Sequence, residues 1–63
     1  MKQVQLKKVL KKDFFRLTPN NSPVWIKDYY DRTEKGYWCY KFDDINHGRF
    51  FKSDRIVFTD FIF

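Results

Sequence analysis

The chain has 63 residues, a formal net charge of +5 at pH 7 and an aromatic content of 22%. A chain of this length forms one domain, here residues 1–63, and it buries only about 60% of its unfolded surface, which leaves little room for a water-excluding catalytic pocket. Its one cysteine excludes a disulfide within the chain, and no segment approaches the roughly 20 apolar residues of a membrane-spanning helix, so we expect a cytosolic (cytoplasmic) protein of a bacterium or of a phage-carrying host cell.

The N-terminal segment carries two apolar patterns. Val4 and Leu6 alternate as in a strand, whereas Leu6, Val9 and Leu10 have the i, i+3, i+4 spacing of a helix. A short strand followed by one helical turn satisfies both patterns. This arrangement directs four lysines away from the buried side, namely Lys7, Lys8, Lys11 and Lys12.

The net charge is concentrated in the first quarter of the chain. Residues 1–16 contain six basic side chains and one acidic one, whereas residues 17–63 contain seven of each. A local positive field attracts polyanions and raises their encounter rates. The alternative is a solvated segment that only keeps the protein soluble.

Residues 13–18 are predicted to form the next strand. In that strand Phe15 and Leu17 share one face, and Phe14 and Arg16 share the other. The following segment, residues 19–23, contains two prolines, two asparagines and a serine, a composition that predicts a turn.

A β-hairpin is predicted between residues 24–30 and 37–42, which are rich in aromatic and β-branched side chains. Glu34, Lys35 and Gly36 fit a three-residue loop whose last residue takes a positive φ. The resulting cross-strand pairs are Thr33 with Tyr37, Tyr30 with Tyr40, and Asp28 with Phe42.

This register assigns the two faces of the hairpin. The more apolar face is expected to meet the core, and it carries Val24, Ile26, Asp28, Tyr30, Trp38, Tyr40 and Phe42. The other face carries lysines, which are expensive to bury without a partner, and it is therefore expected to face solvent. It consists of Trp25, Lys27, Tyr29, Tyr37, Cys39 and Lys41.

The remaining chain predicts two more strands. Residues 43–48 form a loop in which Asp and Asn side chains bond the backbone and Gly48 takes a left-handed conformation. Residues 49–51 form a short strand, residues 52–55 a tight connection and residues 56–63 the last strand. Five or six short strands with little helix predict an all-β fold, either a small antiparallel SH3-like barrel or a strongly bent sheet, because closure protects sheet edges.

Residues 24–63 resemble a group of short, uncharacterised β-rich proteins of bacterial, phage and mobile-element genomes. The matching residues are Tyr30-Asp31-Arg32, Cys39-Tyr40 with Phe42-Asp43-Asp44, and Val57-Phe58-Thr59. The opening LKKVLKKDFF is similar to the start of SH3-like domains, which usually place a glycine before the aspartate, where this chain has Lys12. The resemblance implies a small β fold, and it implies no activity.

The outward hairpin face supplies the candidate binding site. Trp25, Tyr29 and Tyr37 are suited to stack against nucleobases, since every base has a π face, and two lysines beside them are suited to hold phosphates, Lys27 and Lys41. Further phosphate contacts are expected from Lys7, Lys8, Lys11, Lys12 and Arg16. The alternative is that the rings pack under the N-terminal segment or form a dimer contact. No base-reading motif accompanies these residues, so binding would be non-specific.

The sequence gives weaker support for a metal site or a catalytic cysteine. Asp43, Asp44, Asn46 and His47 offer metal ligands within five residues, but the EF-hand pattern is absent and a turn explains them. Cys39 lies in mid-strand without a group to orient His47, which fits a structural thiol rather than a nucleophile. We therefore expect no enzyme activity, no metal and no cofactor.

The leading hypothesis is a non-catalytic nucleic-acid-binding module of a phage or mobile element, with a preference for single strands. The alternative is a protein-interaction or self-associating module that uses the aromatic face and the edge of the C-terminal strand. A third hypothesis, an inhibitor that occupies an enzyme's substrate site, has only the Asp43-Asp44 loop in its favour. No membrane and no small-molecule substrate are expected.

Overall fold

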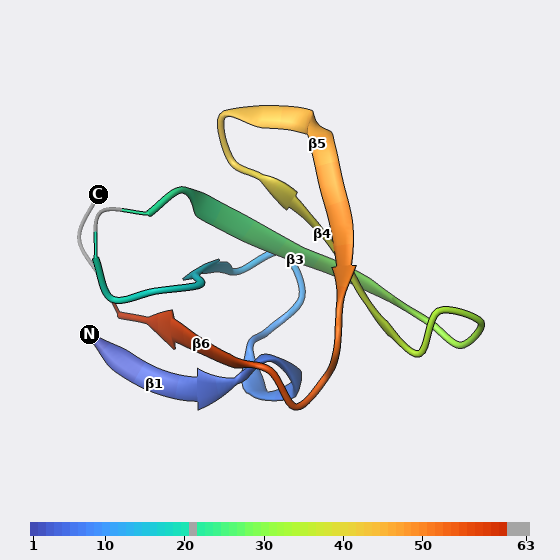
Figure 1. Ribbon diagram of the computed structural model, residues 1–63, viewed down its shortest axis with the longest axis horizontal. Coiled ribbons are helices and arrows are strands. Elements are labelled where there is room, and N and C mark those ends of the chain that lie inside the picture. The colour runs from blue at the N-terminus through green and yellow to red at the C-terminus, as the bar shows by residue number, and fades with distance from the viewer. Residues whose placement is uncertain (21, 61–63) are drawn as a thin grey trace.

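Short strands make up most of the chain in a computed structural model that describes residues 1–20 and 22–60 (Figure 1). The elements within these residues are β1 (Lys2–Gln5), the 3₁₀ turn η1 (Leu6–Lys8), β2 (Phe14–Arg16), β3 (Val24–Asp31), β4 (Gly36–Lys41), β5 (Asp44–Phe51) and β6 (Ile56–Thr59). The predicted strand followed by a helical turn at the N-terminus is therefore confirmed. No helix in the described part of the chain has the length and apolar character needed to cross a membrane.

Across the described residues, six antiparallel strands form one sheet in the order β1-β6-β2-β3-β4-β5. The all-β fold class is thus confirmed, in the form of a strongly bent sheet. Figure 1 shows the bend, since β5 descends steeply while β1 and β6 run nearly across it. The last strand returns to pair with both β1 and β2, and this leaves β1 and β5 as the two edges.

The concave side of the bent sheet holds the core. Among the described residues, seven buried apolar side chains form this core: Leu6, Val9, Phe15, Trp25, Cys39, Phe51 and Val57. Leu17 packs against them on the same side as Phe15, so the predicted sharing of one face by Phe15 and Leu17 is confirmed. Leu10 is instead 73% exposed. The predicted helical spacing fails there because η1 ends at Lys8 and Val9 is already extended, with φ −76° and ψ 136°.

The hairpin exists, but its predicted register is wrong. Tyr30 pairs with Tyr37 and Asp31 with Gly36, so four residues rather than three form the loop. Asp31 sets this closure, because its Oδ1 accepts the backbone N–H groups of Thr33 at 2.8 Å and Glu34 at 3.0 Å. The positive φ falls on Lys35, at 55°, and not on Gly36.

The glycines therefore serve close approach rather than backbone reversal. Neither has a positive φ, so the left-handed conformation predicted for Gly48 is also wrong. A Cβ on Gly36 would lie 2.7 Å from the carbonyl oxygen of Phe51, and one on Gly48 would meet the indole of Trp38. Residues 43–48 likewise do not form a loop, because β5 already begins at Asp44.

The two faces of the hairpin are reversed relative to the prediction. The grouping holds on one side of the bulge in β3, where Trp25 faces Lys41 and Lys27 faces Cys39 across the ladder. Beyond the bulge it fails, because Tyr30 pairs with Tyr37, which the prediction placed on the opposite face. This group points inward, however: Trp25 is 4% exposed, Lys27 5% and Cys39 0%. Two residues predicted to be inside lie outside, since Tyr30 and Phe42 are 48% and 49% exposed.

The prediction assumed that Lys27 would have no partner if it were buried. In the fold it has two partners, and they offset the cost of burying its charge. Its ammonium group donates a hydrogen bond to the carbonyl oxygen of Val9 and lies 4.1 Å from the centroid of the Tyr37 ring. A buried cation is tolerated when a carbonyl and an aromatic face replace part of its hydration.

Two further predictions concern the ends of strands. The tight connection at residues 52–55 is confirmed, and the N–H of Arg55 donates to the carbonyl oxygen of Lys52 at 3.1 Å. The strand predicted over residues 56–63 is β6 as far as Thr59, and its final three residues lie outside the described part of the chain. The turn predicted at residues 19–23 includes Asn21, which also lies outside it.

Candidate functional site

The fold places the basic N-terminal segment against the connection between β5 and β6. The backbone N–H of Leu6 donates to the carbonyl oxygen of Arg55 at 2.8 Å, and that of Lys7 donates to Ser53 at 2.9 Å. Figure 1 shows η1 beside this connection. Two stretches of basic sequence that are more than 40 residues apart therefore adjoin, and Lys7 lies next to a turn that carries Lys52 and Arg55.

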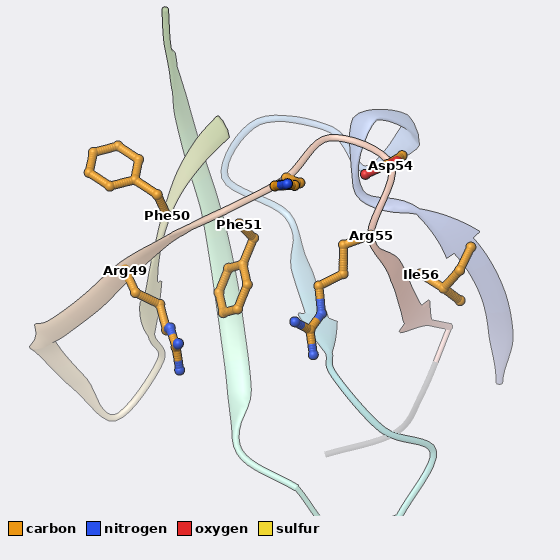
Figure 2. A pocket seen from close by; sticks show the side chains of 7 residues that line it. Arg49, Phe50, Phe51, Asp54, Arg55 and Ile56 are labelled. Atoms are coloured by element: carbon orange, nitrogen blue, oxygen red, sulfur yellow. The ribbon is translucent and has the colours of Figure 1, made fainter. Parts of the chain in front are cut away.

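A groove of about 500 Å³ opens at this connection. We call it the arginine groove, and its lining consists of Arg49, Phe50, Phe51, Lys52, Asp54, Arg55 and Ile56 (Figure 2). Three of these side chains are basic and one is acidic. A smaller hollow of about 180 Å³ contains Lys2 and Lys8 but also Asp13 and Asp60, so its charges balance.

Two guanidinium groups are positioned by one buried ring in the arginine groove. The Cζ atoms of Arg49 and Arg55 lie 5.4 Å and 5.3 Å from the centroid of Phe51. Figure 2 shows the two arginines pointing to the same side of the chain, one on each side of this ring. Phe51 is 5% exposed and meets Trp25 at 5.1 Å and Phe15 at 6.2 Å between centroids. The core thereby holds the platform that aligns both cations.

The geometry follows from strand alternation. Arg49 and Phe51 are two residues apart on β5, so their side chains share a face, and the turn after β5 returns Arg55 to the same ring. Within the described residues, neither arginine nor Lys52 forms an ion pair with a carboxylate. All three are exposed, and their charges are therefore available to an anion from outside.

Lys12 contrasts with these groups because it has a carboxylate partner. Its Nζ lies 3.1 Å from Oδ2 of Asp28, and this hydrogen bond raises the pKa of Lys12. The same ammonium lies 5.5 Å from the centroid of the Tyr40 ring. Its backbone φ is 72°, in the left-handed region that favours glycine.

The other residues that were predicted to contact phosphates differ in their exposure. Lys7, Lys8 and Lys11 are exposed, as predicted. Arg16 is half-buried, and its Nη1 donates to the carbonyl oxygen of Asn20 at 3.4 Å. Lys41 is half-buried with its Nζ 5.9 Å from the centroid of Trp25. Exposure of Lys27 was wrongly predicted, for the reason given above.

The predicted stacking platform does not exist as one surface. Trp25 is buried, and Tyr37 is half-buried against the core and against Tyr30, at 5.0 Å between centroids. Tyr29 alone of the three is well exposed, at 46%. The bulge between Lys27 and Tyr30 turns this ring away from the buried pair.

Aromatic side chains instead cover the convex side of β2 to β5. We call this the outer aromatic face, and it comprises Phe14, Trp38, Tyr40, Phe42 and Phe50. The cross-strand pairing of Trp38 with Phe50 brings these rings to 5.0 Å, and Phe14 meets Phe42 at 5.6 Å. The members range from half-buried to exposed.

Sequence reasoning missed Arg49, Lys52 and Arg55. Net charge did not reveal them, because residues 17–63 contain as many acidic as basic side chains, although Asp54 is the one acidic residue that lines the groove. A usable signal was the alternation Arg49-Phe50-Phe51, which places a cation and a ring on the same face of a strand.

Within the described residues, the side chains considered as metal ligands and Cys39 do not come together in one site. No group of three or more His, Cys, Asp and Glu side chains there has an arrangement that could hold a metal ion. Cys39 is fully buried, and burial raises the pKa of its thiol to about 12. Such a thiol is a poor nucleophile at neutral pH.

Comparison of the chain with known proteins finds no matching family model, no similar curated protein and no similar solved structure.

Proposed function

We propose that this protein is a non-catalytic nucleic-acid-binding module that contacts backbone phosphates through the arginine groove. The observation that carries the proposal is the pair of guanidinium groups held beside Phe51 without a carboxylate partner among the described residues. Planar guanidinium groups match phosphate oxygens in geometry, and a fixed pair loses little conformational freedom on binding.

The surroundings of the groove favour an extended polyanion over a small one. Lys52 lines the groove, the backbone of Lys7 bonds Ser53 in the turn that follows Lys52, and Lys8 and Lys11 follow along the chain. Several phosphates in a row would release counterions together, which makes affinity depend on salt. These contacts are to phosphates, so the proposed binding is independent of base sequence.

A double substitution tests this proposal. Arg49→Gln with Arg55→Gln removes both charges and keeps polar side chains, and we expect roughly ten- to a hundredfold weaker binding to a labelled oligonucleotide at low salt. Arg32→Gln with Lys35→Gln is the matched control, because it removes two charges at the exposed tip of the β3–β4 hairpin. Fluorescence anisotropy gives the Kd of each. Equal losses of affinity in both double variants would show that only net charge matters, and would contradict the arginine groove as the binding site.

A protein-interaction module is the second candidate, and the outer aromatic face favours it. Half-exposed rings on a sheet that ends in the edge strand β5 are suited to a partner. Sedimentation of the protein alone at increasing concentration separates self-association from a monomer.

A further inference from the structure

We infer that the nucleic acid bound by the arginine groove is single-stranded and that its bases stack on Trp38 and Phe50 of the outer aromatic face. This inference rests on the proposed function, and it adds the class of nucleic acid and the side chains that contact its bases. The juxtaposition of a phosphate-binding groove with an adjoining aromatic surface is what carries it.

Trp38 has a fixed position on the outer aromatic face. Its indole lies over Gly48 on the neighbouring strand, so closely that a Cβ at Gly48 would overlap the ring. Phe50 flanks it at 5.0 Å between centroids, with 60° between the ring planes. Both rings are half-buried and thus partly accessible. A ring that is already held in place costs little entropy when a base stacks on it.

The outer aromatic face and the arginine groove are continuous with each other. Phe50 belongs to the outer aromatic face and also lines the arginine groove. Figure 2 shows Phe50 pointing to one side of β5 while Arg49 and Phe51 point to the other. β5 is an edge strand of the sheet, so no further strand separates its two faces. A flexible chain can therefore cross this edge with phosphates in the groove and bases on the rings.

A nucleic-acid duplex does not fit this combination of surfaces. Bases in a double helix are already stacked on their neighbours and present only their edges, so they cannot cover an aromatic face. The positive charge of the groove, in turn, complements a nucleic-acid backbone. Single strands supply both a backbone and free base planes.

The test compares an oligothymidine with an abasic oligonucleotide of the same length, which keeps the phosphates and lacks the bases. We expect the wild-type protein to bind oligothymidine about tenfold more tightly than the abasic chain, because one well-stacked base supplies that factor. Trp38→Leu should lose this preference and leave binding of the abasic chain unchanged. Tyr29→Leu, which removes an exposed ring outside the outer aromatic face, should keep it.

A second variant guards against misfolding. Trp38→Phe retains a ring, so it should retain most of the preference for oligothymidine, while circular dichroism and thermal melting verify the fold of each variant. Equal affinity of the wild type for both ligands, with the arginine double variant still weakened, overturns base stacking and leaves the proposed function standing. Tighter binding to a duplex of the same length overturns the inference as well. Absence of binding to every oligonucleotide removes both proposals.

Discussion

Lys27 places a cation inside the core, where its hydration is replaced by the carbonyl oxygen of Val9 and the ring of Tyr37. Burial lowers the pKa of Lys27 below its ordinary value of 10.5. The folded chain therefore releases this proton at a lower pH than the unfolded chain does. As the pH rises through the window just below 10.5, the free energy of unfolding should increase, because the folded chain loses the buried charge first. At lower pH both states carry the charge, and its cost to the folded state is constant.

We predict a pH signature for this residue. The free energy of unfolding of the wild type, measured relative to Lys27→Met, should rise as the pH increases from neutral toward 10.5. Urea denaturation at a series of pH values gives this difference, in which groups common to both proteins cancel. A difference that stays flat over the series would contradict burial of the charged amine.

Cys39 should show the opposite sign. Burial raises the pKa of its thiol from 9.0 to about 12, so the folded state keeps the proton that the unfolded state loses. Below pH 9 the thiol is protonated in both states, so the free energy of unfolding relative to Cys39→Ala should be constant. Between pH 9 and about 12 it should fall by up to about 1.4 kcal/mol per pH unit. The same thiol should resist a thiol-specific reagent at pH 8 until the chain is unfolded. Rapid labelling of the native protein would contradict the burial.

At the residue scale, sequence reasoning assessed the cost of Lys27 correctly and missed its compensation. The general rule that buried lysines are expensive agrees with the lowered pKa. The partners Val9 and Tyr37 lie 18 and 10 positions away in the sequence, and only the packed fold brings them to the ammonium group. The same argument explains why Trp25 was placed outside: it shares a face with Lys27, and the face was assigned by the lysine.

At the element scale, the β3–β4 hairpin separates what local sequence determines from what it leaves open. Aromatic and β-branched runs predicted both strands. The register could not be predicted because two closures competed, one with Gly36 in the turn and one with Asp31 accepting turn N–H groups. Packing against β5 favours the second, since Gly36 is the residue that lets the Phe51 backbone approach.

Substitutions at two adjacent residues test this register. Lys35 has a φ of 55°, so Lys35→Gly should be neutral or should stabilise the protein by up to about 1 kcal/mol. Gly36→Ala should destabilise it by about 1–3 kcal/mol, because a Cβ would lie 2.7 Å from the Phe51 carbonyl oxygen. Thermal or chemical denaturation gives both values. The reverse order of effects would support the three-residue loop.

At the scale of the whole molecule, the bent sheet brings two distant basic segments to one end. The lysines of the first quarter of the chain were predicted as a charged segment, and their exposure is confirmed for Lys7, Lys8 and Lys11. The arginine groove was not predicted, because it requires β6 to pair between β1 and β2 and η1 to dock on the β5–β6 turn. Contacts of this kind depend on tertiary structure, which local patterns do not encode.

This arrangement predicts how binding responds to salt. Each phosphate contact in a single strand contributes about 0.7 to the slope of log Kd against log salt concentration. Removing Arg49 and Arg55 should therefore lower the slope by about 1.4 if each contacts one phosphate. If the two arginines acted only through the overall electrostatic field of the protein, their removal would change the affinity but would not remove defined phosphate contacts from the slope.

The most direct measurement is this salt dependence for a labelled single-stranded oligonucleotide, compared between the wild type, Arg49→Gln with Arg55→Gln, and the hairpin-tip control Arg32→Gln with Lys35→Gln. We predict a steep slope for the wild type, a slope about 1.4 lower for the groove variant, and no change for the control. Equal slopes in all three proteins, or no binding at low salt, would contradict a phosphate-binding role for the arginine groove.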